Sequence, residues 1–415
     1  MAALVETLVP ARLGLRFRWL LAASWTTNLG DGITLAAGSL LVASLTQDAF
    51  LVSLAALLRW APPLVLGLYA GVLSDRLDRR LIVVVANLVR AIVLAVMVAL
   101  LATGTMTVAA ALVGVGLIAT SEVFVDNTSQ TLLPMIVHRD DLALANARLQ
   151  SGFITVNQLA GPPLGAALFA AGRAWPFLAD GVLVVAGVLM VLKVTLPPHA
   201  RERGSGRGLR HEVAEGVRWT IAHPAVRTLA LTILIFNVTF GAAWSVLVLY
   251  ASQRLGLGPV GFGLLTTLSA VGGLLGTGAY GWITRRVSLG DIMRIGLVIE
   301  TLTHLALALT RSAWFASAVF VVFGAHAFVW GTTSTTIRQR AVPDELQGRV
   351  GGVYVLAVFG GLVVGSAFGG VLAGRYGVTA PFWFAFVGSA IFLVALWREL
   401  TRIAHDPEPS DAGTA

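Results

Sequence analysis

The sequence predicts an all-α integral membrane protein, with twelve transmembrane helices arranged as two six-helix halves. Three observations carry this prediction. The 415 residues are 57% hydrophobic and only 12% charged, whereas a soluble protein carries about 25% charged residues. Twelve apolar runs approach or exceed the roughly 20 residues that a helix needs to cross a bilayer. Short charged turns separate the runs, as at Gly71–Arg80, where five of ten residues are charged.

The first apolar run continues well past the length of a signal-peptide core, so we expect it to be a span. It is also long enough to tilt or to end irregularly. The twelve expected spans are 18–45, 50–73, 81–102, 107–127, 148–170, 176–196, 228–250, 260–283, 291–310, 314–336, 350–373 and 380–400.

Four regions follow from the position of the one long connection. We expect an N-terminal six-helix half at 1–196, a cytoplasmic linker at 197–227, a C-terminal six-helix half at 228–402 and a disordered tail at 403–415. The linker begins polar and rich in Gly and Arg. Its second part, 209–222, places Val213, Val217 and Ile221 at helical spacing between charges, which predicts an amphipathic helix on the membrane surface. A plain tether is the alternative.

The distribution of basic residues predicts the orientation. With the N-terminus inside, 23 of the 29 arginines and lysines fall in inner segments, four in outer segments and two within spans. Cytoplasmic loops carry such an excess of basic residues. Both termini are therefore expected on the cytoplasmic side, and the net charge of +8 needs no nucleic-acid partner.

Two weak patterns recur at one offset and favour a duplication of the six-span half. Asp141-Leu142 precedes Gly161 and Gly165 in span five, and the same arrangement returns 204 residues later before span eleven. The second copy consists of Glu345-Leu346, Gly365 and Gly369. Parallel repeats of this kind relate the halves of some transporters about an axis along the membrane normal.

The turn Gly71–Arg80 resembles the signature loop between spans two and three of the major facilitator superfamily: Gly, any, Leu, small, Asp, Arg, any, Gly, Arg, Arg or Lys. The matching residues are Gly71, Leu73, Asp75, Arg76, Arg79 and Arg80. Asp78 stands where the family has its second Gly, and Asp tolerates turn conformations better than most residues. The resemblance covers about 18–402 and implies the twelve-helix major facilitator fold.

The same resemblance implies that this loop forms a cytoplasmic gate that latches the two halves in the outward-open state. An Asp at the inner face could also stabilise a helix N-terminus, because the helix dipole attracts negative charge there. We expect Asp126, at the end of span four, to pair with the nearby arginines. The alternative is that the arginines only fix the topology.

A second motif lies in span five, where Gly161-Pro162-Pro163-Leu164-Gly165 resembles the Gly-Pro-x-x-Gly core of proton-coupled drug antiporters. Small residues allow close helix approach, and Pro frees a carbonyl and bends the helix. Close packing alone is the alternative interpretation.

Two further stretches are similar to the exporters of drugs, macrolides and siderophores within this superfamily. They are residues 28–32 (NLGDG) and 342–350 (VPDELQGRV). Many drug–proton antiporters carry an arginine in span four, and this span has none. Arg59 or Arg90 would have to substitute for it.

Ionisable residues within spans cost a few kcal/mol each, and five of them are the candidates for proton coupling or substrate binding: Asp31, Arg59, Arg90, Glu122 and Glu300. Asp31 lies about 20 Å from the inner face at 1.5 Å per residue. Burial disfavours a charged carboxylate and a nearby arginine favours it. Asp31 is therefore the first candidate for proton carrier and counter-charge to a cationic substrate, with Arg59 or Arg90 as its switchable partner. A permanent Asp–Arg ion pair is the alternative, and Glu122 either carries protons or belongs to an inner charge network.

Span nine holds a further pair, Glu300 and His304, four residues apart on one helical face. We expect His326 in span ten to be a hydrogen-bonded packing residue rather than a proton relay. Aromatic and amide side chains at mid-depth suit amphipathic organic substrates. The expected cavity-lining residues are Trp25, Asn28, Asn157, Gln158, Asn237 and Trp244.

The sequence predicts no enzyme and no cofactor. It lacks a phosphate-binding loop with Lys and Ser or Thr, and it contains no cysteine that could supply a thiolate metal ligand. We expect a monomeric secondary active transporter in the inner or plasma membrane, surrounded by lipid. It would export drug- or macrolide-like amphipathic organic molecules by proton antiport and alternating access. The alternatives are a dedicated siderophore or lysolipid exporter, an importer, or a non-transporting membrane sensor or scaffold.

Overall fold

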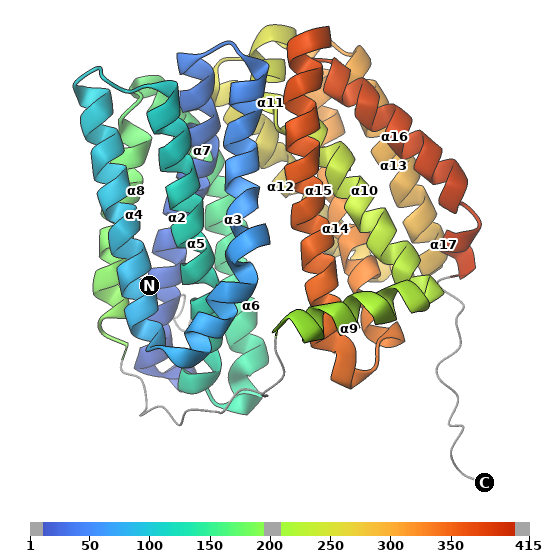
Figure 1. Ribbon diagram of the computed structural model, residues 1–415, viewed down its shortest axis with the longest axis horizontal. Helices are drawn as coiled ribbons and strands as arrows, with labels where there is room; N and C mark the ends of the chain where they lie inside the picture. Colours follow the sequence, from blue (N-terminus) through green and yellow to red (C-terminus); the bar gives the residue numbers. More distant parts are fainter. Residues whose placement is uncertain (1–10, 195–208, 403–415) are drawn as a thin grey trace. The chain divides into compact units, whose positions relative to one another are not determined.

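The computed structural model describes residues 11–194 and 209–402. The chain divides into two compact units, which are described separately (Figure 1). Unit 1 contains the chain up to Gly204 together with Leu257–Thr267, and unit 2 contains the remainder.

Unit 1 is built from the helices of the first six predicted spans. They are α2 (Gly14–Leu45), α3 (Ala49–Arg76), α4 (Arg79–Ala102), α5 (Val108–Ile136), α6 (Leu142–Gly152), the π-helical segment η3 (Phe153–Ala160), α7 (Gly161–Ala171) and α8 (Trp175–Val191). Short 3-10 turns, η1 (Ala11–Leu13) and η2 (Arg139–Asp141), precede α2 and α6. The fifth span is thus one continuous helical run, α6–η3–α7, with a π-helical middle that the sequence did not predict.

Unit 2 begins with the linker helix and contains the remaining spans. Its elements are α9 (Leu209–Ala222), α10 (Pro224–Trp244), α11 (Leu247–Leu249), η4 (Tyr250–Arg254), α12 (Pro259–Thr284), α13 (Leu289–Leu309), α14 (Ala313–Ala341), η5 (Asp344–Leu346), α15 (Gln347–Tyr376), α16 (Ala380–Leu396) and α17 (Glu399–Arg402). The first turns of α12 are grouped with unit 1.

The all-α membrane fold is confirmed, because each predicted run coincides with a helical span. In the described part of the chain, nine spans have the length and apolar character needed to cross a membrane, and α8 and α16 are shorter apolar helices. The α6–η3–α7 run supplies the remaining span.

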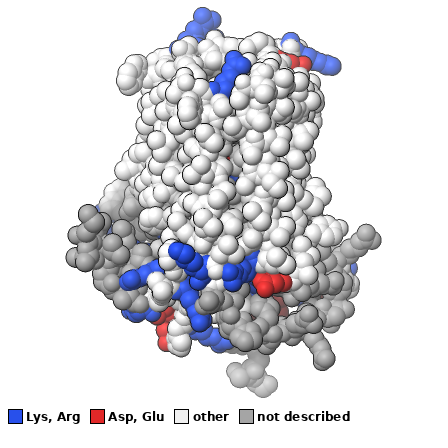
Figure 2. Space-filling model, turned by 90° about the vertical axis from the view of Figure 1, so that its left-hand side faces the viewer, with Lys and Arg blue, Asp and Glu red and all other residues white. Residues whose placement is uncertain are grey.

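Helix α4 shows how the apolar sequence is used. Leu81, Val85 and Ile92 are exposed, while Asn87 and Arg90 on the other face are buried. The helix therefore turns hydrocarbon outward and polar groups inward, as a bilayer requires. The face around α4 and α8 shows a broad uncharged surface, with most of its basic side chains gathered at the lower end (Figure 2).

Close approach of two helix pairs depends on the glycines of the recurring pattern. A Cβ on Gly161 would lie 2.7 Å from the carbonyl carbon of Gly32 on α2, and a Cβ on Gly365 would lie 2.9 Å from the backbone nitrogen of Ala242 on α10. Span five therefore packs on span one, and span eleven packs on span seven. The two copies of the pattern have the same packing role.

Asp78 stabilises the turn between α3 and α4. Its carboxylate accepts hydrogen bonds from the backbone N–H groups of Arg80 at 2.8 Å and Leu81 at 3.2 Å, so Asp78 is the N-cap of α4. Its φ is −63°, a conformation that does not require glycine. The replacement of the family's Gly therefore leaves a tight turn and adds a helix cap.

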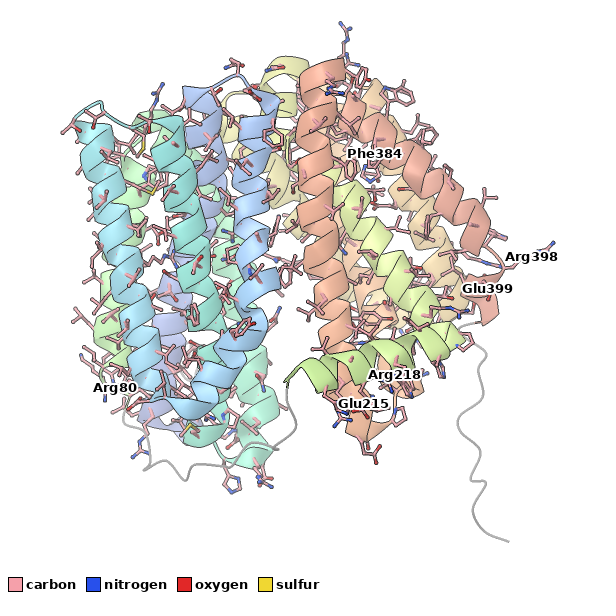
Figure 3. The ribbon with its side chains drawn as sticks, viewed as in Figure 1. Arg80, Glu215, Arg218, Phe384, Arg398 and Glu399 are labelled. Atoms are coloured by element: carbon pink, nitrogen blue, oxygen red, sulfur yellow. The ribbon has the colours of Figure 1, made fainter. Side chains whose placement is uncertain are left out.

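The linker residues 209–222 form a helix, as their spacing predicts, and α9 packs against α15 and α10 in unit 2. Glu215, labelled with Arg218 on this helix in Figure 3, pairs with Arg349 at the start of α15 at 2.9 Å. A Cβ on Gly216 would lie 2.7 Å from the carbonyl oxygen of Arg349. The helix is therefore docked at the end of α15. Residues 197–208 and 403–415 lie outside the described residues.

Candidate functional site

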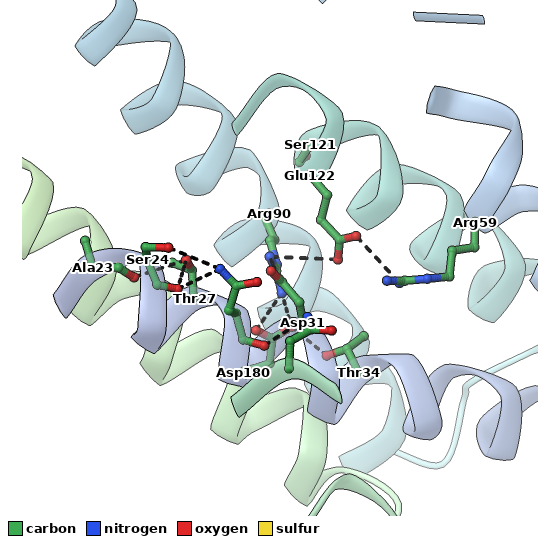
Figure 4. A network of polar contacts seen from close by, with 12 residues as sticks. Ala23, Ser24, Thr27, Asp31, Thr34, Arg59, Arg90, Ser121, Glu122 and Asp180 are labelled. Atoms are coloured by element: carbon green, nitrogen blue, oxygen red, sulfur yellow. Dashed lines mark hydrogen bonds and ion pairs between the residues drawn. The ribbon is translucent and has the colours of Figure 1, made fainter. Parts of the chain in front are cut away.

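A buried polar cluster lies inside unit 1, where α2, α3, α4, α5 and α8 converge (Figure 4). Arg90 is at its centre and is 1% exposed. One guanidinium nitrogen, Nη2, donates to both carboxylate oxygens of Asp180 at 2.8 and 2.9 Å. The other, Nη1, forms an ion pair with Asp31. One cation therefore holds two carboxylates from two different helices.

Glu122 and Arg59 extend the cluster toward its more accessible side. Glu122 Oε1 lies 3.9 Å from Arg90 Nη1, and its Oε2 lies 3.5 Å from Arg59 Nη1. The exposed side-chain fraction rises from 0% at Asp180 to 13% at Glu122 and 21% at Arg59. Arg59 also lies over the ring of Trp60, 5.6 Å from its centroid. Arg90 and Asp180 are therefore enclosed, whereas Arg59 and Glu122 have some access to their surroundings.

Small residues on α2 bring the neighbouring helices to this cluster. A Cβ on Gly30 would lie 3.2 Å from the carboxylate carbon of Asp180, and one on Gly32 would lie 2.9 Å from the Cα of Gly161. Thr34 donates to Asp180 Oδ2 at 2.6 Å. The segment 28–32 thus positions Asp31 while admitting α8 and the fifth span at close range.

The charges of the cluster do not balance. Three carboxylates, those of Asp31, Glu122 and Asp180, face two guanidinium groups, those of Arg59 and Arg90. One negative charge is left over among these paired side chains, which are at most 21% exposed, and an uncompensated buried charge is costly. The site therefore favours uptake of one more positive charge.

Four of the five predicted intramembrane ionisable residues, Asp31, Arg59, Arg90 and Glu122, are brought together here. Asp180 completes the cluster and was missed from the sequence. It lies only five residues after the start of α8, so a depth estimate places it near the membrane surface. The available signal was its charge inside a predicted span.

Unit 2 contains a different cluster around the fifth predicted residue, Glu300. Its Oε1 lies 2.8 Å from His304 Nε2, and its Oε2 lies 3.3 Å from His326 Nε2. All three residues are buried. The aromatic rings of Phe236, Trp244 and Phe323 lie edge-on to the two imidazoles. His326 is thus hydrogen-bonded, as predicted, and its partner is Glu300.

Comparison with known proteins decides the family. Residues 6–411 match the model of a family described as "Transmembrane secretion effector", within the major facilitator superfamily. The chain belongs to this family. It is therefore a transporter and not an enzyme, and the predicted superfamily is confirmed.

One curated relative of this facilitator is "Multidrug efflux pump Tap" from Mycolicibacterium fortuitum. The two are 27% identical over 354 residues, which cover 80% of this chain and 83% of the relative.

Solved transporters share the fold at low identity. A bacterial homologue of the iron transporter ferroportin has a TM-score of 0.75 and 15% identity over 94% of this chain and all of the other. The nucleoside transporter NupG has a TM-score of 0.72 and 13% identity over 95% of this chain and 100% of its own. A bacterial homologue of the lysosomal transporter Spinster has a TM-score of 0.72 and 14% identity over 97% and 100%. Identities this low establish the fold alone.

The predicted gate of the facilitator is described in part. Gly71 lies near the end of α3, and the side chains of Asp75 and Arg76 lie outside the described residues. Arg79 donates to Thr131 O at 3.3 Å and Arg80 donates to Leu192 O. Arg79 thus reaches α5 five residues beyond Asp126, whose own side chain is exposed. The pairing of Asp126 with these arginines stays a prediction.

The predicted cavity-lining side chains mostly serve contacts between and within helices. Trp25 Nε1 donates to Arg148 O at 3.3 Å, and Asn157 donates to Asn28 O at 3.1 Å. Asn28 and Asn237 donate to carbonyls of their own helices, while Trp244 stacks on Phe240. Gln158 is half-buried in η3. Their place in a substrate cavity stays a prediction.

An open groove of about 580 Å³ lies along α14 in unit 2. Sequence reasoning missed this face, although hydroxyl groups three and four residues apart on a helix share one side. Its lining residues are Ala327, Phe328, Gly331, Thr332, Thr335, Thr336 and Gln339.

Proposed function

We propose that this facilitator exports amphipathic organic molecules from the cytoplasm in exchange for protons, by alternating access. It would do so in the cell membrane with both termini cytoplasmic, as the arginine distribution favours. The relative named as a multidrug efflux pump supports an organic substrate and the outward direction.

The observation that carries the proposal is the excess carboxylate of the unit 1 cluster. A buried site with three carboxylates and two arginines is neutral when it holds one proton or one monovalent cation. A proton and a cationic substrate then compete for the same excess negative charge. This competition is the coupling that an antiporter requires, because each ligand displaces the other.

The five residues take different parts in this exchange. Arg90 and Asp180, joined by two hydrogen bonds and fully enclosed, keep α4 and α8 together. Glu122 takes up the proton, because its carboxylate has the looser partners, and Arg59 is the partner that can move away. Asp31 shares Arg90 with Asp180 and responds when Glu122 changes charge.

The open groove along α14 is the proposed substrate contact in unit 2. Thr332, Thr335 and Gln339 offer hydroxyl and amide groups, and Phe328 offers an apolar face. Such a mixed lining suits an amphipathic organic molecule.

Transport in proteoliposomes tests the proposal. A fluorescent lipophilic cation should be driven by an imposed pH gradient in the wild type, and at least tenfold more slowly in Glu122→Gln and Asp31→Asn. Glu345→Gln is the matched control, because Glu345 is an exposed carboxylate in η5. Transport that ignores the pH gradient would refute proton coupling, and absence of any flux across a compound panel would favour a sensor or scaffold.

The cytoplasmic gate has its own test. We expect Asp75→Asn to reduce transport strongly while membrane abundance stays near that of the wild type, because a latch controls the conformational cycle and not folding. Flux and abundance are measured on the same membranes. A loss of abundance in parallel with flux would indicate that the loop only fixes topology or stability.

A further inference from the structure

We propose that Glu300, His304 and His326 form a second proton-binding site, located in unit 2 and separate from the arginine-containing cluster of unit 1. It deepens the proposed function and rests on it only for its role in transport. Proton binding itself can be tested on protein that transports nothing.

The argument begins with hydrogen-bond roles. An ionised carboxylate only accepts hydrogen bonds, so with Glu300 ionised the Nε2 atoms of both histidines must donate. Each imidazole donates to a different oxygen, His304 at 2.8 Å and His326 at 3.3 Å. The two Nδ1 atoms are buried and have no hydrogen-bond partner among the described residues. They are therefore the atoms that remain open to a proton.

The charge of the site then favours proton uptake. Glu300 with two neutral imidazoles carries one negative charge among aromatic rings, and an uncompensated buried charge is costly. A proton bound at Nδ1 of His304, the closer of the two imidazoles, makes that imidazole a cation in direct contact with the carboxylate and leaves the site neutral. No atom needs to move, because the Nε2–H donors stay in place.

Other charged groups lie away from the site. Glu300 is six residues beyond Arg294, about 9 Å along the helix, and α16, which packs against α13, has no titratable residue. Within the described residues, no group of three or more His, Cys, Asp or Glu qualifies as a metal-ion site. The remaining titratable groups on the helices packed around the site are Asp291 and Arg294 on α13, Arg227 on α10, Tyr250 and Arg254 on η4, Tyr280 on α12, Arg338 and Arg340 on α14, and Glu399 and Arg402 on α17.

Trp244 provides a direct readout. Its ring lies edge-on to His304, with centroids 6.0 Å apart, and an imidazolium quenches a neighbouring indole more strongly than a neutral imidazole does. Purified protein in detergent should lose tryptophan fluorescence as the pH falls. This component should be absent in Trp244→Phe and in His304→Gln. A metal chelator is present throughout.

His223 supplies the matched control, because it stacks on Trp219 at 4.9 Å outside this cluster. The Trp244 component should persist in His223→Gln. Glu300→Gln should weaken proton binding at least tenfold, since it removes the anion that stabilises the imidazolium. A purely structural role for Glu300 would leave the titration unchanged.

The outcomes separate this inference from the proposed function. A Trp244 component that survives in His304→Gln, or is missing from the wild type, overturns the second proton site even if the protein transports. A titration with the expected losses supports it even if no flux is found. If His304→Gln fails to fold, Trp244→Phe and Glu300→Gln decide the question alone.

Discussion

Both units bury a carboxylate between helices, yet they compensate it in different ways. In unit 1 the partner of Asp180 and Asp31 is Arg90, which stays protonated under all ordinary conditions. In unit 2 the partners of Glu300 are His304 and His326, whose imidazole rings can be either neutral or protonated. The first cluster has permanent cations and a surplus of carboxylates, and the second has a single carboxylate between two imidazoles. The two units thus bury carboxylates beside partners of different acid–base chemistry.

The largest difference in stability between the two units is expected when a positively charged or imidazole partner is removed from each cluster. Arg90→Gln leaves Asp180 and Asp31 without their cation, and breaking a buried ion pair in this way costs about 3–5 kcal/mol. His326→Gln leaves Glu300 with His304 and offers an amide in place of the imidazole, so about 1–3 kcal/mol is expected. Thermal unfolding of both variants in one detergent, followed by intrinsic fluorescence, compares them. Equal losses of stability in the two variants would contradict the distinction between an arginine partner and imidazole partners.

Arg59→Gln is the control for this comparison. Arg59 pairs with Glu122 at 3.5 Å, and its side chain is 21% exposed. Its loss should therefore lower the free energy of unfolding by no more than about 1 kcal/mol, as for partly solvated pairs. Transport should nevertheless change, because Glu122 then has only Arg90 nearby, at 3.9 Å. A loss of stability as large as that of Arg90→Gln would mean that Arg59 is also a structural cation.

An intermediate effect, equal in the two units, is expected at the repeated glycines. Gly165→Ala would press on the backbone of Ile33, and Gly365→Ala would press on that of Ala242. Overpacking of this kind costs about 1–3 kcal/mol. Unfolding temperatures of the two variants should fall by similar amounts. A loss in only one unit would show that the duplicated pattern has diverged in its packing role.

Matched glycines exist in both units for that experiment. A Cβ on Gly67 in α3 or on Gly278 in α12 would have no neighbour within 4 Å. Alanine at these helix positions should leave stability unchanged or raise it by up to about 1 kcal/mol, because Ala has the higher helix propensity.

The limits of sequence reasoning follow from what each feature depends on. The spans were predictable because bilayer thickness fixes the length of an apolar run. The membership of Asp31, Arg90 and Glu122 in a polar site was predictable because a charge within a span is costly. Asp180 was missed because its pairing depends on how α8 packs against α2 and α4, and periodicity within one helix carries no such information. His326 was assigned to packing for the same reason, since Glu300 is 26 residues away on another helix.

The π-helical segment η3 could be predicted from the sequence only in part. Pro162 and Pro163 lack N–H groups, so the carbonyls before them lose helical partners. The sequence therefore predicted a bend in span five. Whether the freed carbonyls produce a kink or a π-helix depends on the packing of Gly161 and Gly165 on α2, which the sequence alone does not specify.

The smallest expected effects are at two helix caps in corresponding places, one in each unit. Asp78 accepts from Arg80 N and Leu81 N at the start of α4, and Ser288 accepts from Asp291 N at the start of α13. Alanine at either site should cost about 1 kcal/mol, while Asp78→Gly should cost only a few tenths. Unfolding temperatures measured side by side check this order. If Asp78→Ala instead abolished transport at normal stability, Asp78 would act in the gate itself, and the caps of the two units would differ in function as their buried clusters do.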